Sequence, residues 1–137
     1  MIRLLILTTV LCAGMLLAGC AGPAMAPSAS VTTTMQGWER YFALEWTPQR
    51  VADGSTRIEG YLHNTYGSPM GNVRVLAQAL DPANQVVGQR IEWVPGVVPN
   101  FGRSYFIVPS LPPAHQYRVS VWSYDIIDSS DFPRRRW

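Results

Sequence analysis

Three residues in the second half of the chain are of the types that form a nucleophilic catalytic triad. They are Ser104, His115 and Asp125, and a serine hydroxyl beside an imidazole that a carboxylate orients can attack an acyl carbon. The serine is not part of a Gly-x-Ser-x-Gly turn, and any chain with this many serines contains such a combination. We therefore expect no catalytic residue and a protein that is not an enzyme.

Metal-ligating residue types are present, but they are not spaced as a known metal site. Asp125, Asp128 and Asp131 recur every three residues, and oxygen clusters of this kind can bind calcium. Their spacing is not that of an EF-hand loop, and three arginines that follow closely neutralise them more simply. His63, expected on the solvent face of a strand, and His115, expected in a loop, have no zinc-ligand partner at a suitable spacing. We expect no metal and no cofactor.

Cys20 is the residue with the clearest chemistry. Arg3 precedes an uncharged apolar run, which is too short to cross a bilayer because spanning takes about 20 apolar residues. The run closes on Leu17-Ala-Gly-Cys20, which resembles the bacterial lipobox. This resemblance implies cleavage after Gly19 and acylation of the Cys20 thiol and of the new amino group.

Two alternatives to the lipobox are an ordinary secretory signal with a chance cysteine and an uncleaved helix that continues to about Met25. Pro23 and the small residues beside it favour an extended tether over a helix. Two or three acyl chains anchor a protein firmly, whereas one myristoyl chain binds only marginally. Ala21 in place of Asp implies, for a Gram-negative source, transfer to the outer membrane.

Composition divides the chain into four parts. Residues 1–19 are expected to be the signal peptide, 20–37 a lipidated disordered tether of small residues without charge, 38–128 the folded domain, and 129–137 a basic tail. Cys12 leaves with the signal and Cys20 is acylated, so the folded part has no disulfide. All nine acidic residues but only seven arginines lie within 38–131. This balance argues against a nucleic-acid partner.

Apolar residues alternate with polar ones almost throughout the domain, which indicates short β-strands. Within residues 42–46, 58–62, 73–79, 87–93, 106–108 and 117–121, every second residue is expected to face inward. Turn signals such as Asp53-Gly54 and Pro112-Pro113 separate them. Because each strand buries one face, two sheets are needed. The sequence therefore predicts an all-β, antiparallel immunoglobulin-like sandwich of about seven strands.

Several segments resemble the FxLYD-type immunoglobulin-like domains of bacterial surface and periplasmic proteins. They are Gly60-Tyr-Leu-His-Asn64, the strand from Val73 to Asp81, Gln85-Val-Val-Gly88, Gly102-Arg-Ser-Tyr-Phe-Ile-Val108 and Tyr117-Arg-Val-Ser-Val121, within about 57–124. The naming motif differs, since Ala77-Gln-Ala-Leu80 stands where Phe, any residue, Leu and Tyr would be, and only Asp81 matches. The resemblance implies a fold and no enzymatic activity. Asn64 and Asp81 are expected to cap strand ends.

The aromatic residues suggest a binding surface. Strand parity places Trp46 and Trp93 in the core, whereas Tyr61, Trp122 and Tyr124 fall on the opposite face from the inward residues of their strands. If the strands that carry Tyr61 and Trp122 are neighbours, these side chains form an exposed strip of the kind that binds sugars or proteins. The alternative is that the tether, the tail or loops cover them.

The residues Phe132-Pro-Arg-Arg-Arg-Trp137 are unusual for a solvated tail. Each arginine near acidic lipid contributes about 1 kcal/mol to membrane binding. Our hypothesis is that Arg134, Arg135 and Arg136 contact an anionic surface.

Together these observations predict a lipid-anchored lipoprotein that faces the periplasm at the outer membrane. We expect a non-enzymatic interaction or accessory module with an unidentified envelope protein as its partner. The alternative is a module that binds a glycan, either peptidoglycan or polysaccharide, through its exposed aromatic side chains.

Overall fold

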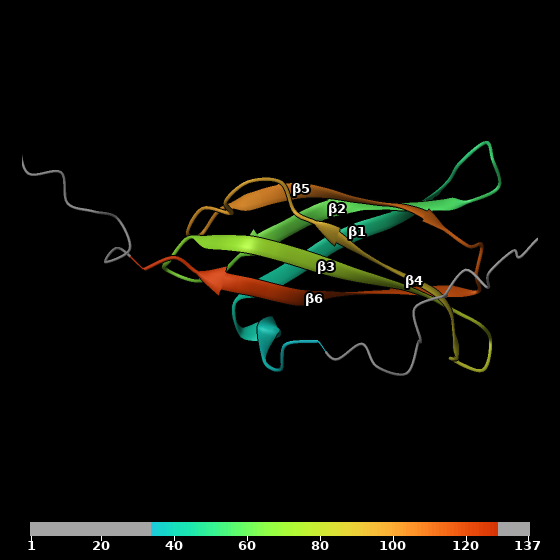
Figure 1. Cartoon of the computed structure of the whole chain (residues 1–137), viewed down its shortest axis with the longest axis horizontal. Coiled ribbons are helices and arrows are strands. Elements are labelled where there is room, and N and C mark those ends of the chain that lie inside the picture. Colours follow the sequence, from blue (N-terminus) through green and yellow to red (C-terminus); the bar gives the residue numbers. More distant parts are fainter. Residues whose placement is uncertain (1–33, 129–137) are drawn as a thin grey trace, which may run out of the picture.

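Residues 34–128 are described by a computed structural model (Figure 1), and their regular structure is almost entirely β-strand. The elements are a short 3-10 helix η1 (Trp38–Arg40) and the strands β1 (Phe42–Arg50), β2 (Thr56–Asn64), β3 (Met70–Leu80), β4 (Val86–Trp93), β5 (Arg103–Leu111) and β6 (Gln116–Ile126). Within this range no helix has the length and apolarity needed to cross a membrane. The predicted cleavage site at Gly19, the lipidated Cys20 and the tail residues Arg134, Arg135 and Arg136 lie outside the described residues.

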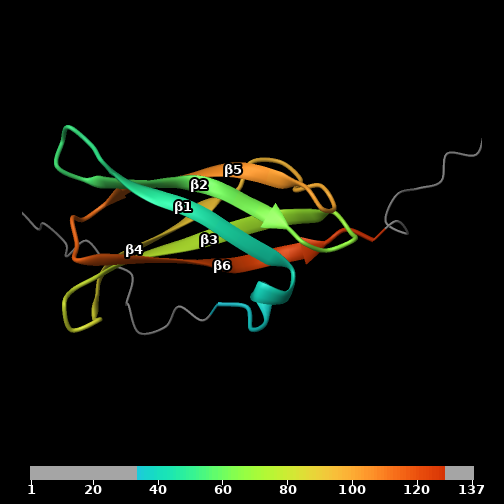
Figure 2. The same ribbon diagram turned by 180° about the vertical axis from the view of Figure 1, so that it is seen from behind.

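The strands form two antiparallel sheets of three strands each. Sheet A has the order β1-β2-β5 and sheet B the order β4-β3-β6. The sheets lie face to face in both views (Figures 1 and 2). This arrangement confirms the predicted immunoglobulin-like sandwich, with six strands among the described residues where about seven were expected.

The core lies between the sheets and follows the predicted alternation. Ile58, Leu62 and Phe106 of sheet A and Val75 and Val121 of sheet B are at most 1% exposed. Burying a side chain of this size contributes about 1.5–3 kcal/mol. Trp46 packs against this cluster as a partly buried residue, which confirms its predicted inward orientation.

Two short polar side chains close loops at strand ends, as predicted. Asn64 is 2% exposed; its amide donates to the carbonyl oxygens of Ser68 at 2.8 Å and Pro99 at 3.0 Å. Its side-chain oxygen accepts the Tyr66 N–H at 2.9 Å. Asp81 accepts backbone N–H bonds from the turn that follows it. Asn64 thereby joins the β2–β3 loop to the β4–β5 loop.

The orientation of β4 is opposite to the prediction. Trp93 is 55% exposed and lies beside Arg74 on the outer face of sheet B, not in the core. The residues of β4 that pair with core positions of β3 are instead Gly88, Arg90 and Glu92, and the last two form an ion pair at 2.9 Å. Charges that point inward from an edge strand oppose pairing with another chain. Apolar periodicity alone therefore assigned the wrong face to this strand.

A β-bulge in β6 changes the predicted orientation of Tyr124. Val75 pairs with Val121 and Arg74 with Ser123, so Trp122 is an extra residue without a partner on β3. Such an insertion reverses the alternation beyond it. Tyr124 consequently packs inward, with its ring centroid 5.0 Å from that of Phe42. It does not share the outer face with Trp122.

Candidate binding surface

The predicted aromatic residues do not form one strip, because the sandwich separates their strands. Tyr61 lies on β2 in sheet A and Trp122 on β6 in sheet B. Both side chains leave their sheets on the outer side, so they lie on opposite faces of the domain. Tyr124 packs against the core. The structure therefore offers two separate aromatic surfaces.

The tryptophan face, on the outside of sheet B, consists of Trp93, Arg74 and Trp122. The Arg74 guanidinium carbon lies 4.7 Å from the ring centroid of Trp93 and 4.3 Å from that of Trp122. Its Nε donates to the Ser123 hydroxyl at 2.8 Å, and the Met35 N–H donates to the Trp122 carbonyl at 3.3 Å. Arg74, on the middle strand β3, thus contacts one indole ring on each of the two neighbouring strands, β4 and β6. One cation therefore contacts both indole rings, and Trp93 remains 55% exposed.

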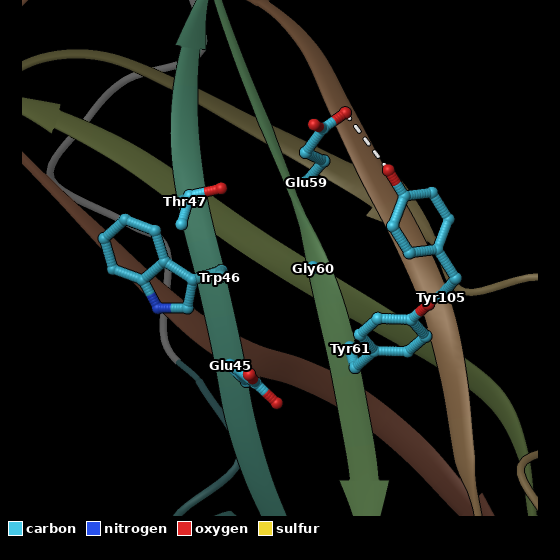
Figure 3. A pocket seen from close by; sticks show the side chains of 7 residues that line it. All are labelled: Glu45, Trp46, Thr47, Glu59, Gly60, Tyr61 and Tyr105. Carbon is cyan, nitrogen blue, oxygen red and sulfur yellow. Dashed lines mark hydrogen bonds between the residues drawn. The ribbon is translucent and has the colours of Figure 1, made fainter.

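The tyrosine face, on the outside of sheet A, consists of Tyr61, Tyr105, Glu59, Glu45 and Arg103. Tyr61 and Tyr105 pair across β2 and β5, with ring centroids 5.3 Å apart in a T-shaped arrangement. They are 36% and 42% exposed. Together with Glu45 and Glu59 they line an open hollow of about 220 Å³ (Figure 3). The tyrosine face is thus an accessible concave surface.

Polar contacts fix Tyr105 in place. Its hydroxyl donates to Glu59 Oε2 at 3.1 Å (Figure 3), and the same oxygen pairs with Arg57 at 3.0 Å. Partial burial first, and then the hydrogen bond to the Glu59 carboxylate, raise the pKa of Tyr105 above its ordinary value. The hydroxyl is therefore protonated at neutral pH and acts as a fixed donor.

Arg103 covers one surface of the Tyr61 ring. Its guanidinium carbon lies 4.4 Å from the ring centroid, a cation–π contact. His63, on the solvent side of the sheet as predicted, lies 3.3 Å from Glu45 Oε2 through its Nε2. On the tyrosine face, aromatic rings and charged side chains therefore lie next to one another. Their mutual contacts hold them in place without a partner.

The three residues considered for a catalytic triad do not come together, and Asp131, considered for calcium binding, lies outside the described residues. Ser104 lies near the start of β5 and Asp125 near the end of β6, whereas the N–H of His115 bonds to Leu80 at the opposite end of the sandwich. The Asp125 carboxylate accepts a hydrogen bond from Asn72 at 2.7 Å. Among residues 34–128 there is no group of three acidic, histidine or cysteine side chains arranged to hold a metal ion.

Tyr105, Glu59 and Arg103 are not among the residues that the sequence predicted for a binding surface. Because Phe106 and Val108 were expected to face inward, parity already placed Tyr105 on the outer face. The pairing of β2 with β5, which brings Tyr105 beside Tyr61, has no signal in the local sequence of either strand.

The chain matches no protein-family model, and no curated protein or solved structure is significantly similar to it.

Proposed function

We propose that this protein is a lipid-anchored envelope lipoprotein whose β-sandwich is a non-enzymatic interaction module, with the tyrosine face as its contact surface for a partner protein. One observation carries this proposal. Tyr61 and Tyr105 are exposed on an open sheet face and are held in place by Arg103 and Glu59. Tyrosine and arginine are the residue types that dominate protein interfaces, and preorganised side chains lose less entropy on binding.

The arrangement of Arg103 favours a protein partner over a glycan. A sugar that stacks on an aromatic ring needs a free ring surface, and the guanidinium already covers one surface of Tyr61. Tyr105 meets Tyr61 at an angle and does not offer a parallel platform. Arg57, Glu59 and Glu45 place both signs of charge around the rings. Mixed charges around an aromatic centre suit electrostatic complementarity with another protein.

The proposed anchor rests on the sequence Leu17-Ala-Gly-Cys20. Acylation of Cys20 would keep the domain at a membrane, and Ala21 favours the periplasmic side of the outer membrane in a Gram-negative source. Loss of the acyl chains from Cys20→Ala should release the protein from the membrane fraction. Retention of that variant in the membrane fraction would contradict the anchor.

The interaction is tested by co-purification of the tagged full chain from solubilised membranes. The matched variants are Tyr61→Ala on the tyrosine face and Trp122→Ala on the tryptophan face. We expect one protein in near-equal amount with the wild type and with Trp122→Ala, and its loss with Tyr61→Ala. Recovery of peptidoglycan fragments instead, with quenching of tryptophan fluorescence by the same fragments, would overturn the proposal in favour of a glycan ligand.

A further inference from the structure

One end of the sandwich exposes large apolar side chains on several segments at once. This apolar end is formed by the β2–β3 loop (65–69), the β4–β5 loop (94–102) and the last residue of β6, which lie together in Figures 1 and 2. The exposed fractions are 41% for Tyr66, 52% for Val97, 74% for Phe101 and 44% for Ile126. An apolar cluster of this kind marks a contact surface for a protein or a membrane.

The two loops are held in fixed positions. The buried Asn64 amide bonds to Ser68 in one loop and to Pro99 in the other, and the Phe101 N–H donates to the Tyr66 carbonyl at 3.2 Å. Phe101 has a φ of 53°, which a residue with a side chain seldom adopts. The loops therefore present Phe101 to solvent in a strained conformation, where a turn alone would favour glycine or asparagine.

A hollow of about 700 Å³ lies beside these loops. Its apolar lining comes from Trp93, Pro95, Val97, Ile126 and Ile127. Asn72 and Asp125 also line it, and the Asn72 amide donates to the Asp125 carboxylate at 2.7 Å, so this carboxylate already has a partner.

The opposite end of the sandwich has a different composition. Its loops, at 51–55, 81–85 and 112–115, carry Asp53, Asp81, Asn84 and His115. Among the large apolar side chains of these three loops, Val51 alone is exposed, at 36%. Val87, just after the 81–85 loop, is also exposed, at 53%. The exposed aromatic rings of Tyr66 and Phe101 therefore distinguish the apolar end from the opposite end, where two valines are exposed.

We propose that the apolar end docks onto the surface of a phospholipid bilayer, with Phe101 and Val97 inserted at the headgroup level. Phenylalanine and aliphatic side chains bury their apolar surface at this level, and a tyrosine such as the nearby Tyr66 is favoured there because its ring meets hydrocarbon and its hydroxyl meets water. β6 leaves the domain at this end, and the residues that follow Asp128 in the sequence include Arg134, Arg135 and Arg136. Arginines near acidic lipids add electrostatic attraction to apolar burial.

The inference rests on the proposed acyl anchor at Cys20. The segment between Cys20 and the domain is long enough for the apolar end to face the membrane that holds the anchor. Thirteen residues separate Cys20 from Thr34, and in extended form they would span at most about 45 Å. Met35 lies against the middle of β6, at Trp122. An 11-residue strand such as β6 is about 36 Å long. The anchor can therefore reach the membrane while the apolar end faces it.

The test places a fluorescent label in the full, acylated chain reconstituted into vesicles of phosphatidylethanolamine and phosphatidylglycerol. Phe101→Cys and Val97→Cys each receive an environment-sensitive fluorophore, and Ala83→Cys in the β3–β4 loop is the matched control. Lipids brominated on their acyl chains are the quenchers. We expect quenching several-fold stronger at positions 97 and 101 than at position 83, and its loss at position 97 when Phe101→Asp is added.

Equal quenching at all three positions would overturn the docking proposal. So would quenching at position 97 that appears only after deletion of residues 129–137, because the tail would then occupy the hollow. Labelling of the unsubstituted chain separates this failure from failure of the anchor, since Cys20 accepts the fluorophore only if it is not acylated. Fluorophores at positions 97 and 101 that are shielded from water in whole membranes but not in lipid vesicles would assign the apolar end to a protein partner. This result would overturn the lipid assignment.

Discussion

The two outer faces of this sandwich use aromatic residues in different ways. On sheet B, Arg74 lies between Trp93 and Trp122, and Met35 bonds to the strand that carries Trp122. On sheet A, Tyr61 and Tyr105 line an open hollow, with charged side chains around them. On sheet B one arginine lies over both indole rings, whereas on sheet A Arg103 lies over Tyr61 only, and Tyr61 and Tyr105 line the open hollow together. Aromatic content alone does not distinguish a binding surface from a structural one; the contacts of each ring do.

Gly60→Ala should have the largest effect, because it breaks the sheet on which the tyrosine face is built. A Cβ at this position would collide with the Glu45 carbonyl and lie 2.6 Å from the Cα of Trp46. Forcing β1 away from β2 should lower the free energy of unfolding by about 3 kcal/mol, measured by urea denaturation.

The matched control is Gly67→Ala, whose Cβ would meet the Phe101 ring at an ordinary 3.8 Å. It should leave the unfolding free energy nearly unchanged. Equal stability of the two variants would mean that β1 and β2 are not as close at Gly60 as described.

Arg103→Ala should weaken partner binding while leaving the fold intact. The substitution removes a positive charge from the tyrosine face and frees the covered surface of Tyr61. For a protein partner we expect a loss of about 2 kcal/mol in binding free energy, or about thirtyfold in Kd, by titration calorimetry. A glycan ligand would instead bind more tightly, because the exposed ring surface becomes available for stacking.

The sequence predicted the strands and the core more reliably than it predicted the outer faces. Alternation identified Ile58 and Leu62 on β2 and Val75 on β3 as core residues, because the middle strand of each sheet needs a continuous inward apolar row. It failed for Trp93 because β4 is an edge strand with inward charges. It failed for Tyr124 because nothing in the local sequence signals the bulge at Trp122. The pairing of β2 with β5 depends on contacts far apart in the chain.

Arg74→Ala should reduce stability and spare partner binding. It removes the cation that joins the two tryptophans and the bond to Ser123. We expect a loss of about 1 kcal/mol in unfolding free energy, with partner affinity equal to that of the wild type. A loss of affinity larger than the loss of stability would make the tryptophan face part of the interface.

Tyr105→Phe should have the smallest effect on stability, and its distinguishing signature is the titration of tyrosine in alkali. The folded pKa of Tyr105 lies above the unfolded value of about 10. Its contribution to stability is therefore present below pH 10 and is lost as the pH rises through the folded pKa. Tyrosinate absorbance should show one late-titrating group fewer in Tyr105→Phe. Loss of a group that titrates near its ordinary pKa of about 10, with the late-titrating groups unchanged, would mean that Glu59 does not hold the Tyr105 hydroxyl.

The most direct test of the proposed interaction is photo-crosslinking in cells from a single position on each outer face. A photoreactive amino acid replaces Ile107, which is 41% exposed beside Tyr105, or Val87, which is 53% exposed on β4. The account predicts a covalent adduct with one protein from position 107 and none with that protein from position 87. No adduct at position 107, the same adduct at both positions, or an adduct with glycan alone would contradict it.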